Sequence, residues 1–107
     1  MEKYSKKEKK KLNELAGLAY ERELNSELSK LENKFTEWKK GKIDSFELNH
    51  EIHLFHNGIS QELYKKYNPR NLIDLTVGWA IANNILKKDE VGKDLLNKLE
   101  LIVERYK

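Results

Sequence analysis

A single apolar stripe runs along the first third of the chain, its members alternately four and three residues apart. They are Leu24, Leu28, Leu31, Phe35 and Trp38. Because residues three and four apart share one face of an α-helix, this spacing predicts a long amphipathic helix over residues 6–40. Ser5 and Glu8 have the spacing of a capping box at its start, and Gly41 suits the left-handed residue after its end. At about 1.5 Å per residue this helix would be about 50 Å long, so we expect its lysine-rich first turns to project, fray or lie against another chain.

A second helix is predicted over residues 45–67, where Asp44 and Glu47 form another capping box. Its main apolar face consists of Leu48, Ile52, Phe55, Ile59 and Leu63. A second group on the same helix, roughly 100° or more away, consists of Phe46, His53 and Tyr64. The short loop before it predicts an antiparallel hairpin with the first helix, and its two apolar faces predict a central position between two neighbours.

Two further helices complete the pattern. Residues 70–87 are apolar on nearly every side, which indicates burial in the core or in a subunit interface. Residues 91–106 form an amphipathic helix with an apolar stripe at Leu95, Leu99, Ile102 and Tyr106. The sequence therefore predicts a single all-α domain over residues 1–107, in which a long N-terminal helical hairpin joins two more helices in a small bundle.

Composition narrows the range of functions. None of the 107 residues is cysteine, which excludes a disulfide framework and any cysteine-ligated metal site. The chain has no glycine-rich phosphate loop, His-Glu-x-x-His motif or nucleophile elbow, so we expect it not to be an enzyme. It has no apolar stretch typical of a signal peptide or membrane span, which predicts a cytoplasmic protein without membrane contact.

The three histidines lie within seven residues of one another on the second helix. Glu47, His50, His53 and His56 are spaced by three, and each such step turns the side chain by about 60° around the helix, so all four cannot bind one ion. Two subsets could hold a divalent transition metal: His53 and His56 joined by Glu21 or Glu23 from the first helix, or Glu47, His50 and Glu51 together with a second copy of the chain. The set favoured here is Glu21, His53 and His56. The alternative is that these histidines are solvated or packed, in which case the protein has no cofactor.

Basic residues are concentrated near the N-terminus, where six lysines fall between positions 3 and 11. The formal net charge is +3, and 18 of the 21 basic residues are lysine. Because arginine rather than lysine favours bidentate recognition of phosphates and bases, this composition predicts at most a salt-sensitive, non-specific binder of nucleic acid. The alternative is a solvated first helical turn, which makes nucleic acid the less favoured partner.

The interpretation favoured by these patterns is a small helical protein–protein interaction or regulatory module without catalytic activity. We expect it to contact a protein partner or to associate with itself as a homodimer. The expected contact residues lie on the overlong first helix and on the apolar third helix: Leu12, Leu15, Ala19, Trp79, Ile81 and Ile85. Metal binding through the Glu/His cluster and lysine-mediated nucleic-acid binding are the alternatives.

Overall fold

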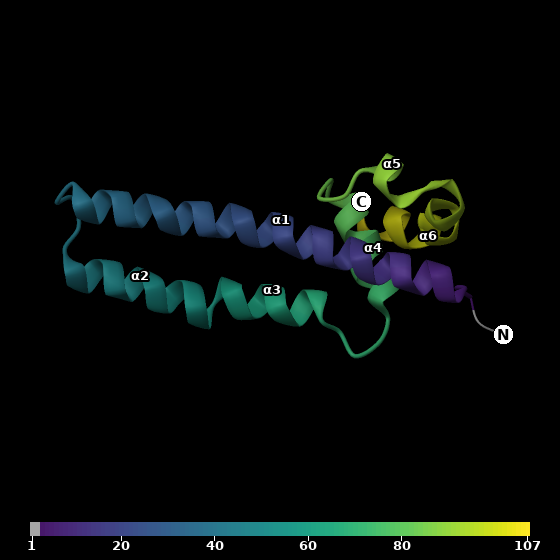
Figure 1. The fold of residues 1–107 in the computed structure, drawn as a ribbon, viewed down its shortest axis with the longest axis horizontal. Helices are drawn as coiled ribbons and strands as arrows, with labels where there is room; N and C mark the ends of the chain where they lie inside the picture. Colours follow the sequence, from purple (N-terminus) through teal and green to yellow (C-terminus); the bar gives the residue numbers. More distant parts are fainter. Residues whose placement is uncertain (1–2) are drawn as a thin grey trace.

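The structure is a computed structural model that describes residues 3–107, and within that range the regular structure is entirely helical. Its elements are α1 (Lys6–Lys39), α2 (Ser45–Asn57), α3 (Ile59–Tyr67), α4 (Ile73–Ala82), the single turn α5 (Lys88–Val91) and α6 (Lys93–Tyr106). The molecule is elongated, with extents of 58 × 26 × 23 Å, because α1 runs nearly its whole length (Figure 1). The predicted all-α fold, with a long N-terminal helix in an antiparallel hairpin, is confirmed.

Both capping boxes form as the sequence predicts. At the start of α1, the Ser5 hydroxyl accepts from the Glu8 backbone N–H at 3.1 Å, and the Glu8 carboxylate accepts from the Ser5 N–H at 2.9 Å. At the start of α2, Asp44 and Glu47 make the same reciprocal pair. Gly41, at φ +76°, is the left-handed residue after α1 that turns the chain into the hairpin.

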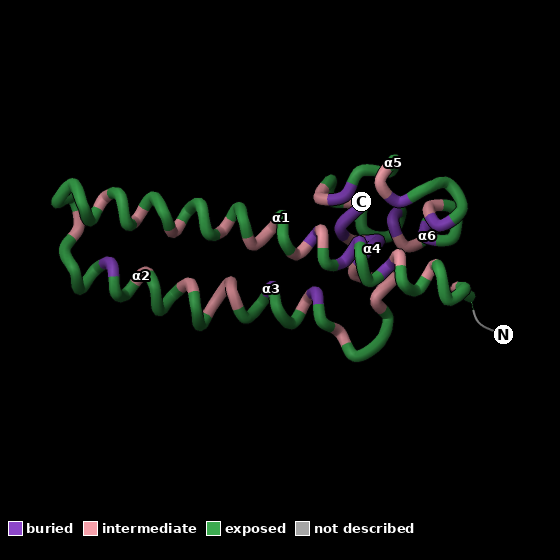
Figure 2. The backbone as a smooth tube through the Cα atoms, in the orientation of Figure 1, coloured by how far each residue is buried: buried purple, intermediate pink, exposed green. Residues whose placement is uncertain are grey.

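The molecule divides into a body with a hydrophobic core and a projecting arm. We define the arm as residues 24–57, which comprise the C-terminal half of α1, the connecting loop and α2, and the body as the rest of the chain. Burial is concentrated in the body, and the arm is mostly exposed (Figure 2). The buried core cluster consists of Leu12, Leu15, Ala16, Ala19, Leu63, Tyr67, Val77, Ala80, Ile81, Leu86, Val91, Leu95, Leu99 and Val103.

The free end of α1 is the opposite end from the one expected. The lysine-rich first turns pack on the body, and the C-terminal half of α1 projects (Figure 1). The small side chains of Ala16 and Ala19 are fully covered, which allows the apolar helix α4 to approach α1 closely at this end. Helices α4 and α6 have 10 and 14 residues, too few to cover the length of the 34-residue α1.

Helix α2 is not the central helix that its two apolar groups predicted. Among its residues, all of which the structure describes, Leu48 is the one that is buried. Phe46, His53 and Tyr64, the second apolar group, are exposed to solvent. The central position belongs to α4, which packs against both α1 and α6.

Two predicted helices are shorter than expected because of local backbone geometry. The helix predicted over residues 45–67 is broken at Gly58, whose φ and ψ of −105° and −101° lie outside the helical region. The helix predicted over residues 70–87 begins at Ile73 and ends at Ala82, because Leu72 and Asn84 both adopt left-handed conformations with φ of +61°. The connection before α6 contains the additional turn α5 and Gly92 at φ +91°.

Candidate functional site

Both helices of the arm carry a coiled-coil-like seam. In α1 the seam is the stripe from Leu24 to Trp38, and in α2 it continues through Leu48, Ile52, Phe55 and on to Ile59, again in steps of four and three. Alternation of four and three is the spacing of heptad a and d positions, which pack helices side by side. The hairpin uses this seam to hold α2 against α1.

The seam is only partly covered by the hairpin. Leu48 is buried and Leu31 and Phe55 are half-buried, whereas Leu28, Phe35 and Ile52 are 45%, 39% and 36% exposed. Each residue of an α-helix is rotated by about 100° from the one before it. Measured from the direction that points to the other helix, Leu28, Phe35 and Ile52 are each rotated by about 20–40° in the same sense about their own helix axis. Since α1 and α2 face each other and run in opposite directions, an equal rotation along each chain moves the side chains of both helices to the same side of the hairpin. We call Leu28, Phe35 and Ile52 the apolar face.

The opposite side of the arm is a small groove with charged edges. It has a volume of about 230 Å³, and apolar residues of both helices form its floor. Along its α1 edge, Lys30 pairs with Glu27 at 3.1 Å and Lys34 pairs with Glu37 at 3.6 Å. The groove side therefore combines compensated charges along α1 with Leu54 of α2, which is 53% exposed.

Polar and aromatic contacts fix both ends of the arm. At the tip, the indole Nε1 of Trp38 donates to the Ser45 hydroxyl at 3.1 Å. At the base, the Glu23 carboxylate accepts from the Tyr67 hydroxyl and pairs with Lys66 Nζ at 2.9 Å. The Lys66 ammonium also lies 3.6 Å from the centre of the Trp79 ring, a cation–π distance.

Tyr67 is the centre of the contacts at the base. Its ring stacks on Tyr20 with the centroids 5.5 Å apart. Burial raises the pKa of the Tyr67 hydroxyl, and the hydrogen bond to Glu23 raises it further, so the group stays protonated as a donor. The cluster of Tyr20, Glu23, Lys66, Tyr67 and Trp79 connects α1, α3 and α4 directly beside the arm.

The six contact residues expected from the sequence lie in or against the core of the body. Leu12, Leu15, Ala19 and Ile81 are buried, and Trp79 and Ile85 are partly buried against the same core. While the body is folded, the four buried side chains are not accessible to a partner. The exposed aliphatic side chains lie elsewhere, at Leu28, Ile52 and Leu54 on the arm and at Leu72 and Leu101 on the body.

Glu21, His53 and His56 are not brought together. The Trp38–Ser45 contact sets the hairpin register, and on that register His53 is level with residue 30 of α1, about 14 Å along the helix from Glu21. Both histidines are exposed to solvent. Over residues 3–107, no group of three or more His, Cys, Asp or Glu side chains is arranged to hold a metal ion.

The N-terminal lysines line part of a groove whose charged residues include both lysines and carboxylates. The groove, of about 800 Å³, lies between the start of α1 and the start of α6. Its charged lining consists of Lys7, Glu8, Lys10, Lys11, Glu14, Lys93 and Asp94. The mixed signs make it less suited to a polyanion than a purely basic groove.

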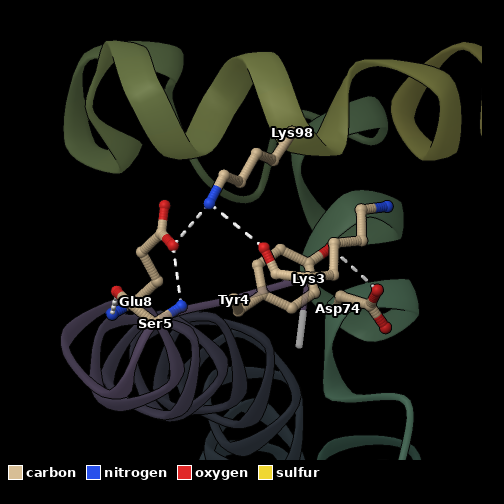
Figure 3. A network of polar contacts seen from close by, with 6 residues as sticks. All are labelled: Lys3, Tyr4, Ser5, Glu8, Asp74 and Lys98. Carbon is tan, nitrogen blue, oxygen red and sulfur yellow. Dashed lines mark hydrogen bonds and ion pairs between the residues drawn. The ribbon is translucent and has the colours of Figure 1, made fainter. Parts of the chain in front are cut away.

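A polar network beside this groove fastens the start of the chain to the body (Figure 3). Lys98 Nζ of α6 donates to the Glu8 carboxylate at 2.7 Å and to the Lys3 carbonyl at 3.1 Å. The Tyr4 hydroxyl donates to Asp74 of α4 at 2.8 Å. The hydrogen bond from Lys98 lowers the pKa of Glu8, and burial raises the pKa of Tyr4. These contacts give the N-terminal segment a structural role.

Comparison with known proteins gave no relative for this chain: no family model, curated protein or solved structure matches it. None of the helices in the described part of the chain combines the length and the hydropathy needed to cross a membrane.

Proposed function

We propose that this chain is a helical protein–protein interaction module whose contact surface is the apolar face of the arm. The observation that carries the proposal is the partial exposure of Leu28, Phe35 and Ile52 on an arm that lies outside the core of the body. Each of these side chains leaves more than a third of its surface in water. Burial of apolar surface contributes roughly 25 cal/mol per Å², so a partner that covers the face gains binding energy from it.

The base of the arm supports this role because its contacts order the chain where the arm begins. Lys66 of α3 contacts both Glu23, the α1 residue directly before the arm, and the ring of Trp79 of α4, so its side chain connects three helices where the arm begins. A surface that is already ordered loses less conformational entropy when it binds a partner. The module therefore presents a preorganised two-helix face rather than a flexible loop.

Site-specific photo-crosslinking tests the proposal. Benzoylphenylalanine replaces Phe35 on the apolar face, and the protein is irradiated in a lysate of the organism that makes it. The matched control carries the same group at Phe46, which lies on the same arm but is 85% exposed on the outer side of α2. We expect protein adducts from position 35 that are absent from position 46. The same adducts from both positions, or none from position 35, would contradict the proposal.

A further inference from the structure

We infer that the partner of the apolar face is the apolar face of a second copy, so that two arms pack antiparallel into a four-helix bundle. This inference rests on the proposed function and names its partner. It follows from the heptad pattern of the arm, its charge and its dimensions.

The heptad pattern of the arm is that of half a four-helix bundle. In such a bundle, the a and d positions of all four helices meet in a shared core. Here Leu31, Leu48 and Phe55 are the more covered seam positions, whereas Leu28, Phe35 and Ile52 remain open. Two other apolar residues of the arm are also open, Trp38 at 39% and Leu54 at 53%, but Trp38 is hydrogen-bonded to Ser45 at the tip and Leu54 lines the groove. Leu28, Phe35 and Ile52 are seam positions of both helices on one side, which is where a second hairpin with the same heptad register completes the core. A second copy supplies that hairpin.

The charge distribution favours contact between arms over contact between bodies. Residues 24–57 contain five lysines and six acidic residues, so two arms meet without a large net repulsion. The rest of the chain contains 16 basic and 12 acidic residues, so two bodies repel each other. An antiparallel arrangement of the arms places the bodies at opposite ends of the dimer and keeps the positive charges apart.

The dimensions of the arm set the strength of this contact. The α1 part of the arm, residues 24–39, is about 24 Å long, and two adjacent helices are about 20 Å wide. Two such faces bury on the order of 1,000 Å² in total, which is at the lower end of specific interfaces. A contact of this size is expected to be reversible. Antiparallel overlap of the arms of two 58 Å molecules gives a particle about 90 Å long.

Sedimentation velocity of the purified full chain over about 1–200 μM tests the inference, together with small-angle X-ray scattering at the highest concentration. We expect a concentration-dependent monomer–dimer equilibrium and a maximum dimension of about 90 Å for the dimer. Phe35→Glu and Ile52→Glu should each weaken dimerisation at least about tenfold, because each places a charge in the shared core. Circular dichroism of each variant establishes that it is folded, and the measurements on the unmodified chain do not depend on either variant.

Phe46→Glu is the matched control, since it adds the same charge to the same arm on the outer side and should leave dimerisation unchanged. A chain that stays monomeric at 200 μM would overturn the inference, as would a dimer weakened equally by Phe46→Glu and Phe35→Glu. A dimer only about 60 Å long would contradict the antiparallel arrangement.

If the chain is monomeric but position 35 still crosslinks to another protein, the self-association fails and the proposed function stands. If position 35 also gives no crosslink, both fail.

Discussion

Gly78 of α4 lies so close to Ile102 of α6 that a Cβ atom added to the glycine would come within 2.3 Å of the Ile102 Cγ2 atom. No side chain fits that space unless Ile102 or one of the two helices shifts. The absence of a side chain at position 78 lets α4 and α6 approach closely, with the neighbouring Val77 and Leu99 fully buried. This close contact is the centre of the body from which the arm projects.

Gly78→Ala should lower the free energy of unfolding by about 1–3 kcal/mol, because the added methyl group overpacks the contact between α4 and Ile102 of α6. Gly17→Ala is the matched control in α1, where a Cβ atom would meet nothing within 4 Å. Alanine in that exposed helical position should raise the free energy of unfolding by about 0.5–1 kcal/mol. Urea denaturation measures both. Equal effects of the two substitutions would contradict the close packing of α4 on α6.

Tyr67→Phe should lower the free energy of unfolding by about 0.5–1.5 kcal/mol. The substitution keeps the ring and its stacking on Tyr20 but removes the hydrogen bond to the half-buried Glu23 carboxylate. Tyr64→Phe, in the same helix but 60% exposed, should change the stability by less than about 0.5 kcal/mol. Thermal denaturation compares the two variants. A loss of stability as large for Tyr64→Phe as for Tyr67→Phe would contradict the role assigned to the base of the arm.

Glu90 should make the stability of the body sensitive to acid. Arg22 holds its carboxylate with two contacts of 2.8 and 2.5 Å, and the Lys87 backbone N–H donates to it at 2.8 Å. The hydrogen bond from Arg22 is the largest cause that lowers the pKa of Glu90 from 4.5 to about 2. A carboxyl group whose pKa is lowered by folding stabilises the folded state above its unfolded pKa, and this contribution disappears as the pH falls through the folded pKa.

The stabilisation from Glu90 is therefore present above about pH 4.5 and is lost between about pH 4.5 and 2. Glu90→Gln should lower the Tm at pH 7, and its Tm should approach that of the unmodified chain near pH 2. Glu100→Gln, on the exposed side of α6, serves as the control and should follow the unmodified chain throughout. Thermal unfolding at a series of pH values measures the three curves. A constant difference between Glu90→Gln and the unmodified chain down to pH 2 would contradict the assignment.

The features of this fold that depend on neighbouring residues could be predicted from the sequence. The capping boxes at Ser5 and Asp44 form because their donors and acceptors are three residues apart on the same chain. The turn at Gly41 and the helical spacing of the apolar stripe are local in the same way. Gly58 shows the limit of this approach, since a glycine is compatible with a continuous helix and only the packing of the chain decides whether it breaks.

The location of the exposed surface could not be predicted because it depends on contacts distant in sequence. The stripe near Leu12 and the stripe near Phe35 have similar helical spacing, and spacing does not show which of them α4 covers. The small residues Ala16 and Ala19 are the one sequence feature that indicates which stripe is covered, since small side chains allow another helix to come close. Phe46 belonged by spacing to a second apolar face of α2, but no other helix in the described part of the chain covers it.

Amide hydrogen exchange along α1 tests the central claim most directly, because this one helix is packed in the body over its first half and forms the arm over its second half. At low micromolar concentration we expect the amides of residues 12–20 to exchange slowly and those of residues 28–38 to exchange faster. At about 200 μM the arm amides should become more protected while the body amides stay unchanged, since the arms then cover each other. Uniform protection along the whole of α1 at both concentrations would contradict the division of the molecule into a closed body and an open arm.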